Sequence, residues 1–102
     1  MTPFKNLGLN DDLLLGIESL GFTTPTPIQE LVIPAALESE NDLIALAHTG
    51  TGKTAAFGLP LLQLIDIERK GVQGLILCPT RELCVQVASD LVKYAAHAHQ
   101  YK

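Results

Sequence analysis

The stretch AHTGTGKT, residues 47–54, decides how this chain can fold. It follows the phosphate-binding pattern G-x-x-x-x-G-K-[ST] except at Ala47, where the pattern has its first glycine. Alanine is the smallest change possible there, and the two later glycines still allow a tight backbone. Lys53 brings a positive charge to phosphate oxygens, and Thr54 brings a hydroxyl to Mg²⁺. The stretch therefore predicts a loop that binds a nucleotide.

The segments on either side of this loop favour the same interpretation. DLIALA, residues 42–47, is an apolar run of strand length, and an apolar pattern of helical spacing runs from Lys53 to Ile65. Pro60 lies inside that helix and should bend it. The alternative is a flexible Gly-Thr turn, which explains neither the lysine nor the flanking segments. Strand, loop and helix are thus predicted in the order that a P-loop requires.

A second strand and a second helix follow in the sequence. Residues 75–78 form another apolar run, and a long helix over 80–98 can begin at Thr80. Two strands separated by a helix imply a right-handed βαβ unit, with a parallel sheet and flanking helices. Such a sheet normally has about five strands. We therefore expect an α/β fold truncated after its second strand and helix, whose open edges favour a homo-oligomer or a swapped dimer.

Two shorter helices are predicted before the P-loop. Asn10 or Asp11 can cap the first, which ends at Gly21, a residue that readily adopts a left-handed conformation. The break TTPTP follows, and Pro27 suits the first turn of the second helix. Pro34 should interrupt or kink that helix, so that a third short piece follows it.

Composition limits the classes of protein that the chain can represent. The 102 residues suffice for one core, and 47% hydrophobic with 18% charged residues is typical of a folded globular chain. A net charge of −4 gives no indication of a nucleic-acid partner, whose usual sign is a basic surface. The apolar runs are shorter than a membrane span, and no secretory signal opens the sequence. We expect a cytoplasmic protein without membrane contact.

The cysteines and histidines give no sign of a metal site. The spacing of Cys78 and Cys84 fits neither a C-x-x-C redox motif nor a zinc ligand set, so two buried thiols are expected. His97 and His99 have no neighbouring carboxylates and are interpreted as part of a solvated helix end.

Three segments together resemble one family. GFTTPTPIQ (21–29), AHTGTGKT (47–54) and PTRELCVQ (79–86) are similar to the Q motif, motif I and motif Ia of DEAD-box RNA helicases, in the family's order. Phe4 matches the isolated aromatic residue that the family places upstream of its Q motif. The resemblance implies that residues 1–102 form the N-terminal part of the first RecA-like domain, a partial RecA-like P-loop fold.

The resemblance also implies a site for ATP and Mg²⁺. Gln29 would read the adenine edge, because its amide offers a donor and an acceptor that match adenine N6 and N7, and a solvated helix residue is the alternative. Phe4 or Phe22 would pack against the ring. Lys53 and Thr54 are the expected catalytic residues, at the β- and γ-phosphates and at Mg²⁺. The expected nucleotide-binding residues are Phe4, Phe22, Gln29, Ala47, His48, Thr49, Gly50, Thr51, Gly52, Lys53 and Thr54.

Motif Ia implies RNA as a partner. In the family this motif touches the RNA backbone, which transfers to Pro79, Thr80 and Arg81. A helix N-terminus with a hydroxyl and a guanidinium is also, on physical grounds, a phosphate site that reads no sequence. The alternative is that Thr80 is a plain helix cap and Arg81 forms a surface ion pair with a carboxylate such as Glu82.

Some family features differ or do not occur in these residues. His48 stands where the family usually has glutamine or glutamate, and Cys84 where it usually has alanine, and neither change removes a phosphate contact. The D-E-A-D segment, the S-A-T segment and a second RecA-like domain with its arginine finger do not occur in the sequence. Asp66, the one acidic candidate for the metal, lies too far along the helix after the P-loop to reach the phosphates.

These features predict the N-terminal segment of an ATP-dependent RNA helicase, whose parent couples ATP hydrolysis to RNA duplex unwinding. The segment by itself should be inactive as an ATPase, because residues that stabilise the transition state are missing. The alternative is a nucleotide-binding fragment without turnover. Another P-loop enzyme, such as a small-molecule kinase, is disfavoured because the Q motif and motif Ia accompany the loop.

Overall fold

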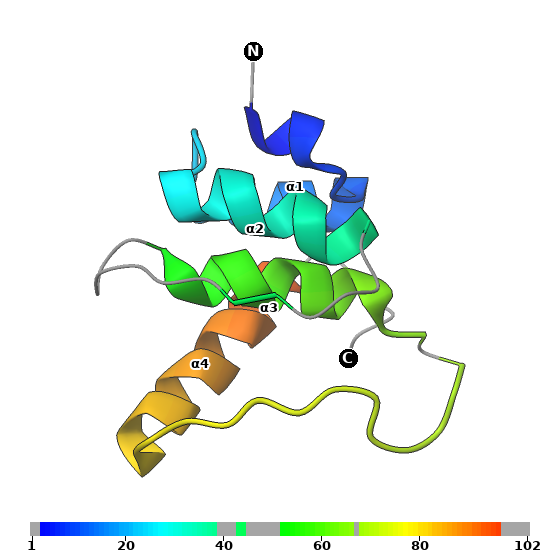
Figure 1. Cartoon of the computed structure of the whole chain (residues 1–102), viewed down its shortest axis with the longest axis vertical. Helices are drawn as coiled ribbons and strands as arrows, with labels where there is room; N and C mark the ends of the chain where they lie inside the picture. The colour runs from blue at the N-terminus through cyan, green and yellow to red at the C-terminus, as the bar shows by residue number, and fades with distance from the viewer. Residues whose placement is uncertain (1–2, 39–42, 45–51, 67, 97–102) are drawn as a thin grey trace.

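A computed structural model describes residues 3–38, 43–44, 52–66 and 68–96. Helices α2 and α3 lie side by side, and α4 packs against both α3 and α1 (Figure 1). The short helix η1 rests on α2 near the N-terminus. The elements in chain order are the 3₁₀-helix η1 (Pro3–Leu7) and the α-helices α1 (Asp11–Ser19), α2 (Pro27–Glu38), α3 (Lys53–Leu64) and α4 (Arg81–Tyr94).

Helix α1 begins and ends as its sequence predicts. The Asn10 side chain accepts a hydrogen bond from the Leu13 N–H at 2.9 Å, so Asn10 rather than Asp11 is the cap. At the other end, Gly21 has a φ of 89°, and the Phe22 N–H donates back to the Ile17 carbonyl at 3.1 Å. This backward bond is characteristic of a Schellman motif. This hydrogen bond fixes the position of Phe22 just after the helix.

Two prolines lie inside continuous helices. Helix α2 runs from Pro27 to Glu38 through Pro34, so the expected third piece is the end of the same helix. Helix α3 likewise runs through Pro60, ends at Leu64 and is followed by Ile65 in an extended conformation. Packing of α2 against α3 along their lengths supports both helices and compensates for the hydrogen bond that each proline lacks.

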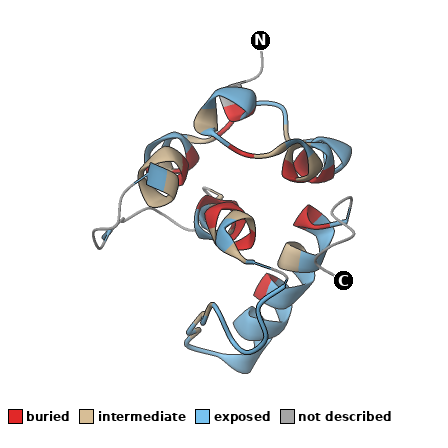
Figure 2. Ribbon diagram, turned by 90° about the vertical axis from the view of Figure 1, so that its right-hand side faces the viewer, coloured by how far each residue is buried: buried red, intermediate tan, exposed pale blue. Residues whose placement is uncertain are grey.

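The core lies between the helices, where the buried faces meet (Figure 2). Leu13, Ile17, Ile33 and Leu59 are its fully buried large side chains. Burial of one such side chain stabilises the fold by about 1.5–3 kcal/mol. Gly16 permits the contact between α1 and α4, because a Cβ atom at this position would collide with the Tyr94 carbonyl oxygen.

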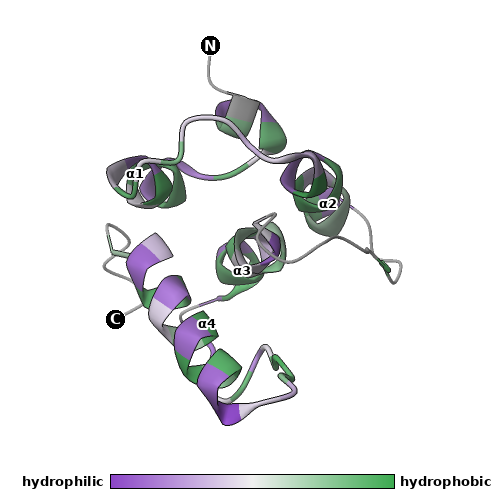
Figure 3. Ribbon diagram, turned by 90° about the vertical axis from the view of Figure 1, so that its left-hand side faces the viewer, coloured by the Kyte–Doolittle hydropathy of each residue, from purple (hydrophilic) through white to green (hydrophobic). Residues whose placement is uncertain are grey.

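The predicted strands are not found among the described residues. Residues 72–78 form an extended connection, in which Leu75 and Leu77 are 78% and 86% exposed. Most of the expected partner strand, 42–47, lies outside the described residues, and Ile44 within it is 89% exposed. A parallel strand depends on neighbouring strands for its hydrogen bonds and its burial. The parallel sheet is therefore not confirmed. Figure 3 shows apolar residues both between the helices and on the connection that leads into α4.

None of the helices in the described ranges combines the length and the apolar character needed to cross a bilayer.

Candidate nucleotide-binding site

Gln29 joins the Q motif to the end of the P-loop. Its Oε1 accepts a hydrogen bond from the Thr26 N–H at 2.9 Å, and its Nε2 donates to the Gly52 carbonyl at 3.1 Å. The side chain is only 3% exposed, so the alternative of a solvated helix residue is wrong. The bonds leave one Nε2 hydrogen and one Oε1 lone pair unused by these two partners. Gln29 is thus placed between the two motifs that were expected to share one ligand.

Gly52 fits this junction because it lacks a side chain. Its φ is 84°, a conformation that favours glycine, and an added Cβ would collide with Gln29 Nε2. The same Cβ would lie 3.2 Å from Thr26 Oγ1, a buried hydroxyl without a hydrogen-bond partner in the described part of the chain. A buried hydroxyl beside open glycine backbone suits a bound polar group such as a phosphate.

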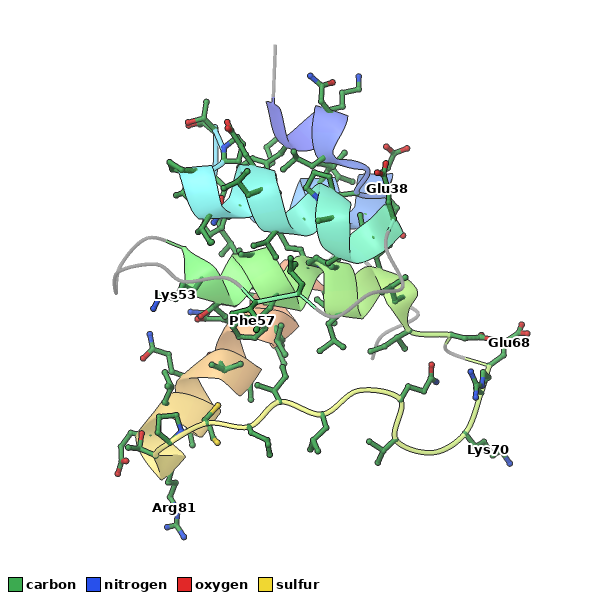
Figure 4. All side chains as sticks on the ribbon, in the orientation of Figure 1. Glu38, Lys53, Phe57, Glu68, Lys70 and Arg81 are labelled. Atoms are coloured by element: carbon green, nitrogen blue, oxygen red, sulfur yellow. The ribbon has the colours of Figure 1, made fainter. Side chains whose placement is uncertain are left out.

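Lys53 and Thr54 form the first turn of α3. Lys53 is exposed and extends from the start of the helix into open space (Figure 4), and Thr54 is half-buried. Gly52 supplies no side-chain cap, so the first N–H groups of α3 are not capped by it. A helix N-terminus next to a lysine is a favourable place for phosphate. The remaining loop residues expected at the nucleotide, Ala47, His48, Thr49, Gly50 and Thr51, lie outside the described residues.

Phe4 and Phe22, the two aromatic residues of which one is expected to pack against adenine, lie together. Their ring centroids are 6.2 Å apart, and both rings line a cavity of about 510 Å³, a size that suits a small ligand. Phe4 is only 3% exposed, whereas Phe22 is half-buried. The rest of the lining comes from η1, α1 and the segment after Phe22: Lys5, Asp11, Leu14, Leu15, Ile17, Glu18 and Thr23.

A second cavity, of about 850 Å³, lies at the start of α3. Gly52, Lys53 and Thr54 line it, together with Phe22 and Tyr94. Phe22 therefore borders both cavities, while Gln29 lines neither. The P-loop residues 52–54 and Phe4 thus line different cavities, and Phe22 contributes to both. Adenine contact by Gln29 stays a prediction.

The residues of motif Ia lie at the start of α4. Thr80 Oγ1 accepts a hydrogen bond from the Leu83 N–H at 3.1 Å, which confirms Thr80 as the cap of the helix. Its hydroxyl hydrogen stays available to another acceptor. Pro79, Thr80 and Arg81 are all exposed, and Arg81 points away from the other helices (Figure 4). The position is open to a phosphate, and RNA contact there stays a prediction.

Comparison with known proteins now decides the family. The sequence profile of the DEAD/DEAH box helicases matches residues 26–102. The chain belongs to the DEAD/DEAH box helicase family. It is 54% identical over 97 residues to the DEAD-box ATP-dependent RNA helicase CshA of Bacillus cereus, covering 95% of this chain and 18% of that protein. It is 50% identical over 91 residues to the ATP-dependent RNA helicase DbpA of Bacillus subtilis, covering 89% and 19%. The chain thus spans about a fifth of these relatives.

Solved structures of DEAD-box proteins resemble the fold. A DEAD box protein from the hyperthermophile Methanococcus jannaschii gives a TM-score of 0.86 at 43% identity, over 90% of this chain and 25% of that one. Dbp5 of S. cerevisiae, bound to RNA and ADP BeF3, gives 0.88 at 37% identity, over 92% and 24%. The neighbours are RecA-like DEAD-box helicase domains, which supports the RecA-like part of the predicted fold.

The cysteines of this helicase-family chain are not two buried thiols. Cys84 is exposed and Cys78 is partly exposed, because α4 and the connection before it are largely uncovered. A hydrogen bond with the Cys84 side chain, together with local burial and the charge of Cys84, raises the pKa of Cys78. His97 and His99 lie outside the described residues. Within the described ranges, no group of three or more histidine, cysteine or acidic residues could hold a metal.

Two residues near the site were missed by sequence reasoning. Tyr94 is buried with its ring centroid 6.0 Å from that of Phe22, and burial followed by the charge of Asp90 raises its pKa to about 12. The helical spacing of Val87, Leu91 and Tyr94 could have revealed it as part of an inward stripe. Gln63 links α3 to the segment before α1, and no periodic pattern in the sequence indicates such a link.

Proposed function

We propose that this chain is the N-terminal part of the first RecA-like domain of an ATP-dependent RNA helicase, and that it binds ATP with Mg²⁺. The observation that carries the proposal is the Gln29 side chain, which bonds both to Thr26 in the Q motif and to Gly52 in the P-loop. This contact joins the segments 21–29 and 47–54, and it supports the proposal that both serve one nucleotide.

Each part of the nucleotide has a proposed partner in the chain. The residues 47–54 and the N-terminus of α3 would hold the phosphates, with the Lys53 ammonium neutralising their charge. Thr54 would hold Mg²⁺, which supplies further positive charge to the phosphates when bound. The Nε2 hydrogen and the Oε1 lone pair that Gln29 does not use with Thr26 and Gly52 would serve the adenine edge. Phe22, which borders both cavities, would pack against the base.

The proposed parent reaction couples ATP hydrolysis to RNA duplex unwinding. Pro79, Thr80 and Arg81 would contact RNA phosphates at the exposed start of α4, a contact that carries no sequence information. The similarity to Dbp5 bound to RNA supports RNA as the partner. These 102 residues contain no D-E-A-D segment. We therefore propose that the chain by itself binds nucleotide without hydrolysing it. Each group that stabilises the transition state matters greatly for this reaction, since loss of an arginine finger alone lowers related rates by about 10³ to 10⁵.

Calorimetric titration of ATP and ADP with Mg²⁺ tests nucleotide binding. Lys53→Ala should weaken both ligands at least about tenfold, because a charge-assisted bond to phosphate is lost. Lys70→Ala is the matched control, since Lys70 is an exposed lysine on the opposite side of the molecule (Figure 4) and should leave both affinities unchanged.

The Gln29→Ala variant tests base recognition through the preference between two nucleotides that carry the same phosphates. It should reduce the preference for ATP over GTP, provided that far-ultraviolet circular dichroism shows the same helix content. An intact chain that binds no nucleotide, or a Lys53→Ala chain that binds as well as the intact one, would show that the proposal is wrong for this chain.

A further inference from the structure

Gln63 connects the last turn of α3 to the linker between η1 and α1. Its Oε1 accepts a hydrogen bond from the Asn10 N–H at 2.7 Å, and its Nε2 donates to the Gly8 carbonyl at 2.7 Å. Both partners lie more than fifty residues earlier in the chain, with separations of 53 and 55. A single planar amide thus holds the linker by an N–H and by a carbonyl.

This linker joins the two walls of the 510 Å³ cavity. Phe4 and Lys5 on η1 form one wall, and residues of α1 such as Asp11 and Leu14 form much of the other. Asn10 also caps α1 through its side chain, so the backbone that Gln63 holds is the start of α1 itself. Movement of the linker would change the separation of the two walls.

Helix α3 relates this cavity to the phosphate end of the site. Its first residue is Lys53, and Gln63 is its next-to-last residue, so roughly 15 Å of helix separates the two regions. Gln63 lines neither the cavity of Phe4 nor that of Lys53. We therefore expect Gln63 to act on a ligand through the linker that it holds, and not by direct contact.

We propose that Gln63 is a positioning residue for base recognition, which holds the linker between η1 and α1 on α3 so that the Phe4 wall of the cavity stays in place. The inference rests on the proposed function, nucleotide binding by this chain. Glutamine suits the role because it donates and accepts at once. Glutamate in its place could still accept from the Asn10 N–H but would set a carboxylate against the Gly8 carbonyl.

The test compares ADP with inorganic pyrophosphate, each with Mg²⁺, by calorimetry on the full 102-residue chain. Gln63→Leu should weaken ADP binding about tenfold, a loss expected from two hydrogen bonds, and should change pyrophosphate binding less than about twofold. Gln63→Glu should weaken ADP by a smaller factor. Equal weakening of both ligands would mean a merely structural role, and unchanged ADP binding would also overturn the proposal.

Gln73→Leu is the matched control. Gln73 also bonds to a backbone N–H and a backbone carbonyl, both of Asp66, at 2.8 Å and 2.7 Å, in a loop that contributes nothing to the Phe4 cavity. This variant loses the same kinds of bond as Gln63→Leu and should leave the affinity for ADP unchanged. A tenfold loss in the control as well would overturn the assignment to Gln63.

A second measurement needs no ligand. In nuclear magnetic resonance spectra of the intact chain, the Phe4 and Phe22 rings should give cross-relaxation peaks, since their centroids are 6.2 Å apart. Gln63→Leu should weaken these peaks and keep those between Phe22 and Tyr94, while helix content stays the same. If the intact chain binds neither ligand, the proposed function fails, and unchanged Phe4–Phe22 peaks would then overturn the positioning role separately.

Discussion

Leucines in two regions of this molecule have opposite environments. Leu13 in α1 and Leu59 in α3 are fully buried, whereas Leu75 and Leu77 in the connection before α4 are 78% and 86% exposed. A helix satisfies its backbone within its own segment, so α1, α2 and α3 need one another only for packing. A strand needs a partner even for its hydrogen bonds. The packing of α1, α2 and α3 therefore holds the Q motif in place. Motif Ia follows a connection that lacks such packing.

The largest expected difference in stability is between two variants, in each of which one leucine from one of these regions is replaced by alanine. Leu59→Ala should lower the free energy of unfolding by about 2–5 kcal/mol, because it leaves a cavity in the core. Leu77→Ala should change it by less than about 0.5 kcal/mol, because the side chain is already in solvent. Urea titrations followed by circular dichroism measure both. Similar losses in the two variants would show that the connection is packed in solution and would remove the contrast.

Two glycines give the next contrast. Gly52→Ala should lower the free energy of unfolding by about 2–3 kcal/mol, because the new Cβ collides with Gln29 and the positive φ disfavours alanine. Gly71→Ala should cost about 1 kcal/mol, since its φ is 98° but, among the described residues beyond its two chain neighbours, no atom lies within 4 Å of the new Cβ. Thermal unfolding of both variants would show the difference. Equal costs would mean that the Gln29 side chain simply moves aside.

The raised pKa of Tyr94 predicts how the stability of the fold changes at high pH. Its pKa rises from about 10 in the unfolded chain to about 12 in the fold, so the protonated form is favoured by folding. The contribution is complete below pH 10 and is lost as the pH rises through 12. Allowing for screening by solvent, we expect a loss of about 1–2 kcal/mol. Tyr94→Phe keeps the ring and should abolish this step in unfolding curves, and a step that persists in the variant would belong to other groups.

Substitutions in the exposed connection should change the self-association of the chain and leave its free energy of unfolding nearly unchanged. We expect copies of the chain to associate through residues 72–78, where Val72, Leu75 and Leu77 are open to solvent. The variant Leu75→Lys/Leu77→Lys should lower the mass seen by light scattering at high concentration. A monodisperse monomer of the intact chain at that concentration would contradict this expectation.

Local signals in the sequence predicted the helices well. The caps at Asn10 and Thr80 and the stop at Gly21 depend on bonds within a few residues, which the sequence displays directly. The effect of Pro34 was overestimated, because packing against a neighbouring helix outweighs one lost hydrogen bond. The strand at 75–78 was predicted from its apolar run alone, and that run cannot supply the partners a strand requires.

The motifs in the sequence predict which residues form the candidate site, but not the contacts that these residues make. Gln29, Lys53 and Thr54 stay predictions as nucleotide-binding residues, and the structure places Gln29 beside Gly52 at the start of α3. The partners of Gln29 and Gln63 could not be foreseen. Bonds between a side chain and a distant backbone depend on the tertiary fold and leave no periodic trace in the sequence.

The carbonyl of Gly52 accepts two hydrogen bonds, one from Gln29 Nε2 and one from the Ala56 N–H at 3.2 Å. A carbonyl oxygen has two lone pairs, so both are in use. The Ala56 N–H makes the first hydrogen bond of α3 to this carbonyl, so Gln29 from α2 contacts α3 at the residue where the helix begins. A side chain from another helix thus holds the start of α3, where Gly52 supplies no side-chain cap, and Lys53 follows directly in the first turn.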